Sequence, residues 1–420
     1  MKKLSLVLIA ASLYAADIGT LFDAIKKQPE TKIDNLQVKN AKIAKKSVIN
    51  SLYPTVNLFS SAEHYNSPFS LRPVTPTQSA YLLKTNASIP FSQNIIRVGF
   101  DVSMPLFIKT IYDNKEKMSH IINAAKYKAK LNLLQRESML VIYLSNLNYL
   151  YSLKKALLVQ KNSIQESIKA IEVGVKVGRI PEFKLLRLKD AVNQIDIKIN
   201  DIDSKIADTN SKIYTLTKIH LKKPINFQTS SVKKEEFLAV KPIKENIKAS
   251  LLDIKAKKDD FLPKVFFKIS ANRGFGWAYN TKDSVALNTA SAGIYINWNI
   301  FNKKRNSEVQ KAKIEYMNSK LTLQKTIKEL TSQIEKIDKT LKIVNRSLSL
   351  AKKSVKIKEE LLKSAKVAFK LGTMTVDEYL NYENDLALAK ANVANLKATK
   401  NSLIAQKAFI YGNNFKKVFK

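Results

Sequence analysis

The chain has 420 residues, a formal net charge of +37 and no cysteine. The lack of cysteine excludes disulfides, thiolate metal sites, cysteine nucleophiles and a lipid-modified N-terminal cysteine. A charge this high suggests nucleic-acid binding, but the lysines are scattered along the chain and mixed with Glu and Asp. Because no nucleic-acid-binding motif accompanies them, solvated helix faces explain the lysines better, and no nucleic-acid partner is expected.

The N-terminus has the pattern of a secretory signal peptide over residues 1–16. Lys2 and Lys3 precede an apolar run, Leu4–Leu13, and the small residues Ala15 and Ala16 follow it. This run is too short to cross a bilayer, and no other stretch of about 20 apolar residues occurs in the sequence. We therefore expect an exported protein.

The rest of the chain contains an internal repeat. Val98–Lys109 matches Ala292–Lys303 at an offset of 194 residues, and the same offset pairs Gly178 with Gly372. The segments between these matches therefore have equal length in the two copies. Self-similarity of this kind sets the architecture of a chain and is considered before any local pattern.

A second match lies upstream in each copy, where Pro54 aligns with Pro263 at an offset of 209 residues. The first copy consequently has 15 additional residues between Pro54 and Gly99. They fall within residues 66–97, which are rich in Pro, Ser, Thr and Asn. That composition predicts a loop.

Each predicted repeat contains a helix, two strands and a long helical hairpin. The first repeat spans residues 17–225, with strands at 55–65 and 98–107 and long helices at 108–177 and 181–220. The second spans residues 226–420, with strands at 264–273 and 292–301 and long helices at 302–371 and 375–411.

The predicted strands alternate between apolar and polar residues, most clearly at 98–107 and 292–301. Such alternation over about ten residues suits a membrane barrel with lipid outside and water inside. A half-buried strand in a soluble sheet has the same pattern. Four strands cannot close a barrel, so closure requires several copies of the chain. Two copies reach the minimum of about eight strands, and three give about twelve.

The long helices are predicted to pack as coiled coils. Residues 294–371 contain neither Gly nor Pro, and apolar residues recur in steps of three and four from Leu323 to Phe369, interrupted by Lys358. Residues 185–216 repeat this pattern, with Thr209 in one apolar place. Sustained spacing of this kind predicts helix-on-helix packing rather than a cofactor site. A helix of about 70 residues would extend on the order of 100 Å.

The sequence does not favour an enzyme. His64, His120 and His220 are far apart and lie in unlike contexts. There is no glycine-rich phosphate loop, nucleophile elbow or paired carboxylate motif. We therefore expect no catalytic residues, no cofactor and no metal site.

Several motifs resemble the outer-membrane efflux protein family, the TolC-like outer-membrane channels. They are Tyr53-Pro54 and Leu262-Pro263, Pro105-Leu106-Phe107 and Asn299-Ile300-Phe301, and Lys370–Leu380, KLGTMTVDEYL. The last of these is similar to the family's turn between its final two long helices. The order, doubling and spacing of the motifs carry the resemblance across essentially the whole mature chain.

The resemblance implies a mixed, mainly α fold and a homotrimer. In it, a 12-stranded transmembrane β-barrel is continuous with a 12-helix periplasmic α-barrel. A mixed belt would come from the N-terminal residues, Leu221–Lys241 and the C-terminus. The location would be the outer membrane of a Gram-negative type envelope, in contact with its lipid. The function implied is the exit duct of a tripartite efflux pump or type I secretion system, with a periplasmic adaptor and an inner-membrane transporter as partners.

The resemblance also implies a pore entrance at the periplasmic tip. Its predicted residues are Gly178, Arg179, Lys184, Gly372, Asp377, Glu378 and Asn381. A ring of three Glu378 side chains would attract cations, although an acid at that position also suits the start of a helix. We expect the closed tip to be latched by Arg179 or Lys184 together with Asp377 or Glu378.

One alternative is open from the sequence. A non-channel exported coiled-coil scaffold or adaptor protein would also have long helices that bind partners. Periplasmic adaptors, however, contain one helical hairpin, whereas this chain has two hairpins and four alternating strands. These features favour the channel.

Overall fold

The computed structural model describes residues 17–221 and 223–420, so the predicted signal peptide at 1–16 lies outside the described residues. The described chain forms two compact units. The strand unit consists of Val38–Ala125 and Ile243–Thr322. The hairpin unit consists of residues 17–37, 126–242 and 323–420. Each unit therefore takes segments from both predicted repeats.

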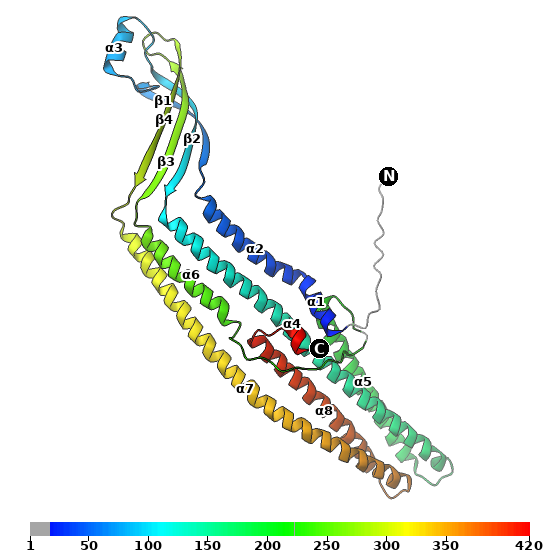
Figure 1. The fold of residues 1–420 in the computed structure, drawn as a ribbon. Coiled ribbons are helices and arrows are strands. Elements are labelled where there is room, and N and C mark those ends of the chain that lie inside the picture. The colour runs from blue at the N-terminus through cyan, green and yellow to red at the C-terminus, as the bar shows by residue number, and fades with distance from the viewer. Residues whose placement is uncertain (1–16, 222) are drawn as a thin grey trace, which may run out of the picture. The chain divides into compact units, whose positions relative to one another are not determined.

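The strand unit is built on one antiparallel sheet with the strand order β1-β2-β3-β4 (Figure 1). Its strands are β1 (Thr55–Ser70), β2 (Phe91–Phe107), β3 (Lys264–Trp277) and β4 (Ser284–Asn297). The helices α2 (Pro29–Asn50) and α6 (Val240–Asp259) precede β1 and β3, and α3 (Pro76–Lys84) lies between β1 and β2. Within the described sheet, β1 and β4 each have one unpaired edge.

The register gives the sheet one apolar and one polar face, because side chains alternate along a strand and paired residues share a face. One rung of the apolar face consists of Val56, Val102, Ile269 and Ala292. The adjacent rung of the polar face consists of Asn57, Asp101, Ser270 and Ser291. The apolar face is open on the single chain, since Leu58 is 86% and Ile296 69% exposed. Apolar surface left open in this way marks a contact with lipid or with another protein.

The strands of the first repeat are longer than predicted. The strand predicted at 55–65 continues to Ser70, and the strand predicted at 98–107 begins at Phe91. The expected loop at 66–97 is therefore mostly strand and helix, because only residues 71–90 lie between the strands and they contain α3. A polar composition did not mark a loop here, since one face of this sheet is lined mainly by polar residues.

The strands of the second repeat also differ from the prediction. The strand predicted at 264–273 continues to Trp277, and β4 covers 284–297 rather than 292–301. After β4, the indole N–H of Trp298 donates to the carbonyl oxygen of Phe261 at 3.0 Å. The Arg305 guanidinium donates to the carbonyl oxygen of Asn299 at 3.2 Å. The apolar alternation thus continues in the sequence after pairing with β3 has ended.

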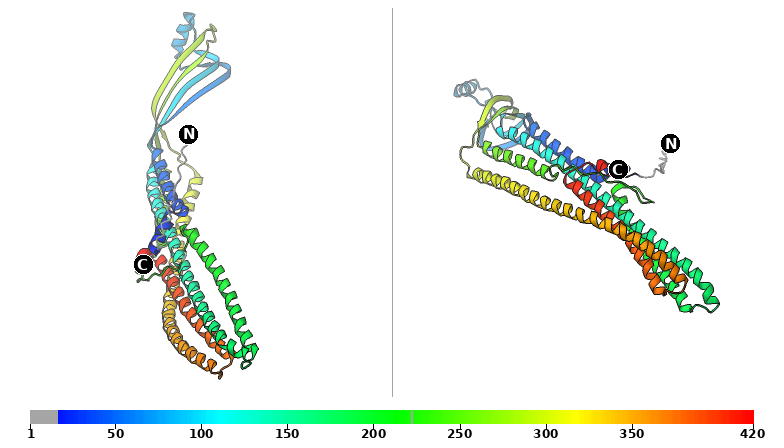
Figure 2. Two further views of the ribbon diagram at one scale, coloured as in Figure 1. Left: turned by 90° about the vertical axis from the view of Figure 1, so that its right-hand side faces the viewer. Right: turned by 60° about the horizontal axis from the view of Figure 1, so that its bottom comes forward.

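Two helical hairpins form most of the hairpin unit (Figures 1 and 2). The first joins α4 (Lys109–Lys176) to α5 (Glu182–Thr217), and the second joins α7 (Lys303–Lys370) to α8 (Val376–Ile410). Both α4 and α7 have 68 residues. Residues of the predicted apolar seams are buried, among them Leu188, Ile195, Ile202, Ile334, Ile337 and Val344.

Ion pairs connect the two helices of each hairpin. Lys154 reaches Asp203 and Lys161 reaches Asp196, both at 2.6 Å, between α4 and α5. Lys358, the residue that interrupts the predicted seam of α7, pairs with Asp385 of α8. A lysine at a seam position thus meets a carboxylate of the neighbouring helix.

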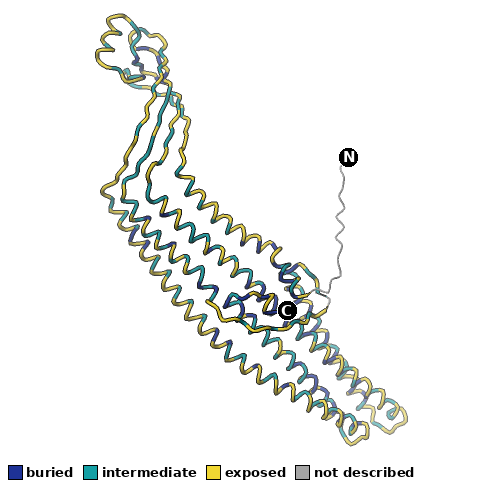
Figure 3. Tube along the Cα trace, in the orientation of Figure 1, coloured by how far each residue is buried: buried dark blue, intermediate teal, exposed yellow. Residues whose placement is uncertain are grey.

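The two ends of the described chain meet the α5–α6 connection in the hairpin unit. Phe22 of α1 (Ile18–Lys27) and Phe415 of α9 (Phe415–Val418) are fully buried, with ring centroids 6.0 Å apart. Gln228 and Lys420 exchange two backbone hydrogen bonds, of 2.8 and 3.1 Å. Buried residues gather around α1 and the C-terminus (Figure 3). None of the described helices is both long and apolar enough to cross a membrane.

Candidate pore entrance

The two hairpin turns depend on glycine in the left-handed region. Gly178 has φ +72° and Gly372 has φ +78°. After each of them a backbone N–H reaches back five residues, from Arg179 to Gly174 at 2.8 Å and from Thr373 to Ala368 at 3.1 Å. This is the Schellman arrangement that ends a helix on glycine. A side chain would find open space at either glycine, so the backbone conformation alone requires this residue.

The structure places the predicted entrance residues in the two hairpin turns and at the starts of α5 and α8, and among the described residues no ion pair joins any two of them. Asp377, near the start of α8, forms an ion pair with Arg187 of α5. Among the described residues, neither Arg179 nor Lys184 forms an ion pair with Asp377 or Glu378. Within one chain, the basic partner of Asp377 is thus Arg187, and the latch through Arg179 or Lys184 stays a prediction. Arg187 lies one helical turn further along α5 than Lys184, where it reaches the carboxylate.

The Arg187–Asp377 pair is exposed, with 55% and 63% of the two side chains accessible. Exposed ion pairs contribute about 0–1 kcal/mol. The pair can therefore bias the closed arrangement of the two turns without fixing it. Asn381 is exposed on α8, one helical turn beyond Asp377.

Glu378 forms the capping box of α8. The backbone N–H and the hydroxyl of Thr375 each donate to Oε2 of Glu378 at 2.8 Å, and the Glu378 N–H donates to the Thr375 hydroxyl at 3.2 Å. These bonds, led by the one from the backbone, hold the pKa of Glu378 below its usual value. The cap fixes where the carboxylate lies and keeps it ionised.

A buried polar network that the sequence analysis missed lies directly after this cap. Tyr379 is fully buried, and its hydroxyl donates to Glu383 at 2.7 Å and accepts a hydrogen bond from Ser167 of α4 at 3.0 Å. The Ser163 hydroxyl lies 3.2 Å away. The ring stacks on Phe369 of α7 at a centroid distance of 4.6 Å. Tyr379 therefore joins α4, α7 and α8 just behind the turn.

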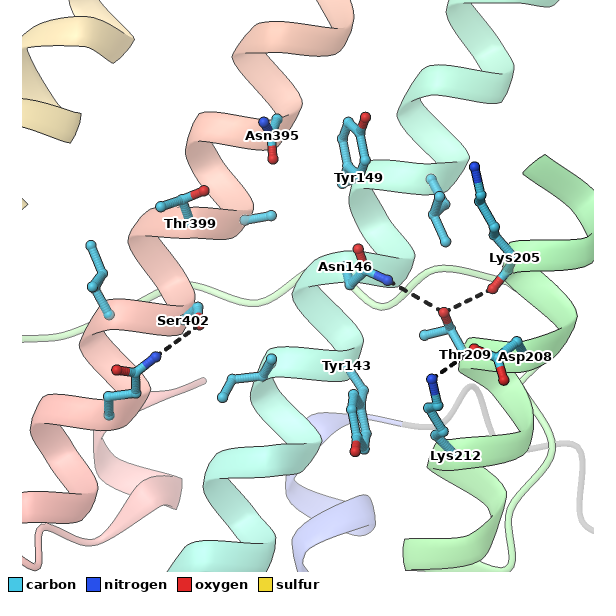
Figure 4. A pocket seen from close by; sticks show the side chains of 15 residues that line it. Tyr143, Asn146, Tyr149, Lys205, Asp208, Thr209, Lys212, Asn395, Thr399 and Ser402 are labelled. Carbon is cyan, nitrogen blue, oxygen red and sulfur yellow. Dashed lines mark hydrogen bonds and ion pairs between the residues drawn. The ribbon is translucent and has the colours of Figure 1, made fainter. Parts of the chain in front are cut away.

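An open groove lies between α4, α5 and α8, with a volume of about 620 Å³ (Figure 4). Tyr143, Asn146 and Tyr149 of α4 line it, and the Asn146 amide donates to the Thr209 hydroxyl at 3.3 Å. Its two lysines are neutralised within α5, since Lys205 pairs with Asp201 and Lys212 with Asp208, each at 2.7 Å. The groove thus offers amides, hydroxyls and aromatic edges with little net charge.

No group of histidines and acids suited to a metal ion occurs in the described part of the chain. The three histidines have separate environments. His64 contacts Asn94 at 2.7 Å, His120 contacts Glu245 at 2.7 Å, and His220 stacks on Tyr214 at 4.2 Å. The structure does not bring them together.

Comparison with known families identifies a match in the second half of the chain. Residues 240–406 match the family described as outer membrane efflux protein. No curated protein sequence matches the chain significantly. The family match confirms the resemblance inferred from the motifs, and it agrees with an outer-membrane location and a periplasmic extension.

Solved structures extend the match in fold to nearly the whole chain. The CmeC outer membrane channel of Campylobacter jejuni aligns with a TM-score of 0.74 and 17% identity, covering 94% of this chain and 86% of that one. VceC of Vibrio cholerae aligns with a TM-score of 0.76 and 12% identity, covering 94% and 96%. The Neisseria gonorrhoeae MtrE outer membrane channel, in its open state, aligns with a TM-score of 0.73 and 13% identity, covering 94% and 89%. The chain has the fold of these TolC-like outer-membrane channels.

Proposed function

We propose that three copies of this chain form the exit duct of a tripartite efflux pump or a type I secretion system. The observation that carries the proposal is the four-stranded sheet, with two unpaired edges, an exposed apolar face and a polar face. Open strand edges do not persist in hydrocarbon. Three such sheets would close a barrel of about twelve strands, with lipid outside and water inside.

The helices would continue the duct on the periplasmic side. In three copies, α4, α5, α7 and α8 would supply about twelve helices of an α-barrel. A periplasmic adaptor and an inner-membrane transporter would deliver the substrate to this barrel. The duct itself then needs no catalytic residue, because the pump supplies the energy.

The hairpin turns would line the entrance of the duct. Gly178, Arg179, Lys184, Gly372, Asp377, Glu378 and Asn381 are the residues that we assign to it. The Arg187–Asp377 contact is the candidate latch, and three capped Glu378 carboxylates would attract cations.

Assembly and conductance test the proposal together. The protein is extracted from the outer-membrane fraction, its mass in detergent is measured by light scattering, and it is reconstituted in planar bilayers. We expect the mass of three chains and discrete conductance steps. A freely soluble periplasmic protein without channel activity would contradict the duct and favour the exported scaffold or adaptor instead.

A charge swap tests the latch. Arg187→Glu and Asp377→Arg, made singly, place like charges together, so each is expected to raise the open probability about two- to fivefold, in keeping with an exposed ion pair. The double variant restores opposite charges and should return to the wild-type value. If the double variant instead behaved like the sum of the single ones, the two residues would not act as a pair.

A further inference from the structure

The end of β1 departs from the regular ladder. Pairing runs from Thr55 with Ser103 to His64 with Asn94, then resumes in a shifted register at Phe69 with Ser92. Residues 65–71, which we call the strap, begin at this break. Bulges of this kind bend a strand and re-aim its side chains, and they are frequent at barrel rims.

The strap lies over the polar face of the sheet. Gly274 belongs to that face, because it pairs with Arg97 and alternates with Arg273 of the apolar face. The side chain of Leu71 lies 3.7 Å from the position that a Cβ of Gly274 would occupy, and Leu71 is 3% exposed. Ile95 lies one rung further on the same face and is 1% exposed. An apolar residue of a water-facing surface is thus covered by the chain itself.

Arg97 of β2 connects the strap to the sheet. Its guanidinium donates to the Glu63 carboxylate of β1 and to the carbonyl oxygen of Ser70 at 3.3 Å. It also lies over the Phe69 ring, 6.0 Å from the centroid, and that ring stacks on Tyr65 at 4.5 Å. Only 18% of the Arg97 side chain is exposed. One arginine therefore contacts Glu63 just before the strap, and Phe69 and Ser70 near its end.

We propose that Arg97 is a positioning residue, and that the strap it holds is the size-limiting constriction at the exit of the duct. This rests on the proposed function, in which the polar face lines the pore. The strap lies at the end of the sheet opposite the helices that adjoin Thr55 and Phe107, which makes it the outer end. The β3–β4 turn is short and gives no second strap, so three straps would face one another in the trimer.

The cysteine-free chain allows a direct test. Asp101→Cys places one thiol on the polar face, four residues from Arg97 along β2 toward the helices. Intact cells are treated from outside with a small maleimide or with maleimides carrying polyethylene glycol of increasing mass. In the wild-type background the small reagent should react readily and the larger ones slowly. Arg97→Ala should raise the rate with the larger reagents by about tenfold.

Two controls accompany this variant. Arg273→Ala removes an arginine from the opposite face of the sheet and should leave every rate unchanged. A reporter on α3, Ala80→Cys, should react equally with all reagents in every background. If the polymer-bearing maleimides labelled Asp101→Cys at the same rate with and without Arg97→Ala, the proposal that the strap limits size would be wrong. Failure of the small reagent to reach Asp101→Cys in every background would instead count against the duct itself.

A disulfide rescue separates positioning from misfolding. The Leu71 Cβ lies 3.9 Å from the ideal Cβ of Gly274, a separation that suits a disulfide. We add Leu71→Cys and Gly274→Cys to the Arg97→Ala variant and oxidise the pair. The closed disulfide should restore slow labelling by the polymer reagents, and its reduction should make labelling fast again. Fast labelling with the disulfide closed would show that the strap is not the barrier.

Discussion

At the scale of single residues, Glu137 predicts a pH-dependent stability. This α4 residue is 5% exposed, and burial raises its pKa from 4.5 to about 7, against the opposing effects of Lys26, Lys416 and Arg136 and with the help of Asp23. The folded state binds the proton more tightly than the unfolded chain does. The contribution of Glu137 to stability is therefore greatest below pH 4.5 and is lost as the pH rises through 7. Above pH 7 the loss is about 3 kcal/mol.

Glu137→Gln should remove this loss. We expect the variant to unfold at a higher temperature than wild type at pH 8, and at nearly the same temperature at pH 4.5, by circular dichroism in detergent. Glu116→Gln, at an exposed position of the same helix, serves as the matched control and should change neither value. An equal gain at both pH values would mean that Glu137 acts through packing rather than through its charge.

At the scale of elements, Tyr379 predicts how the start of α8 is held against α4. Tyr379→Phe keeps the ring stacked on Phe369 but leaves Glu383, which is 3% exposed, and Ser167 without the hydroxyl. An unsatisfied buried polar group costs about 1–3 kcal/mol. We expect faster amide hydrogen exchange in residues 376–386 and a higher open probability in bilayers. The neighbouring Tyr382→Phe should leave both unchanged, and faster exchange over the whole of α8 would contradict a local role.

The elements also separate what the sequence predicts from what it does not. The long helices follow from seam periodicity and the lack of breakers, and the turns follow from glycine, so α4, α5, α7 and α8 lie close to the predicted bounds. The Tyr379–Ser163 contact joins residues 216 positions apart, and no local pattern encodes it. The strap could not be predicted from the sequence, because its polar composition is typical of a loop. Its place on the sheet depends on contacts with Arg97 and Gly274, which belong to other strands. The pairing of Arg187 with Asp377 depends on the relative rotation of α5 and α8, which no local pattern encodes.

At the scale of the whole molecule, the net charge of +37 predicts how assembly responds to salt. The proposed trimer would bring three such charges together, and self-repulsion of a highly charged compact state destabilises it. The Debye length falls from about 30 Å at 0.01 M to about 8 Å at 0.15 M ionic strength. The apolar contacts that would hold the barrel closed are far less sensitive to salt over this range. We therefore expect the trimer to dissociate at a higher temperature in 0.15 M than in 0.01 M sodium chloride, measured by semi-native electrophoresis after heating in a non-ionic detergent.

Glutamates substituted for lysines at exposed positions of α7 should reduce this dependence on salt in proportion to the charge removed, because overall repulsion and not any one contact causes it. Dissociation promoted by salt would instead mean that ion pairs between the copies dominate the assembly.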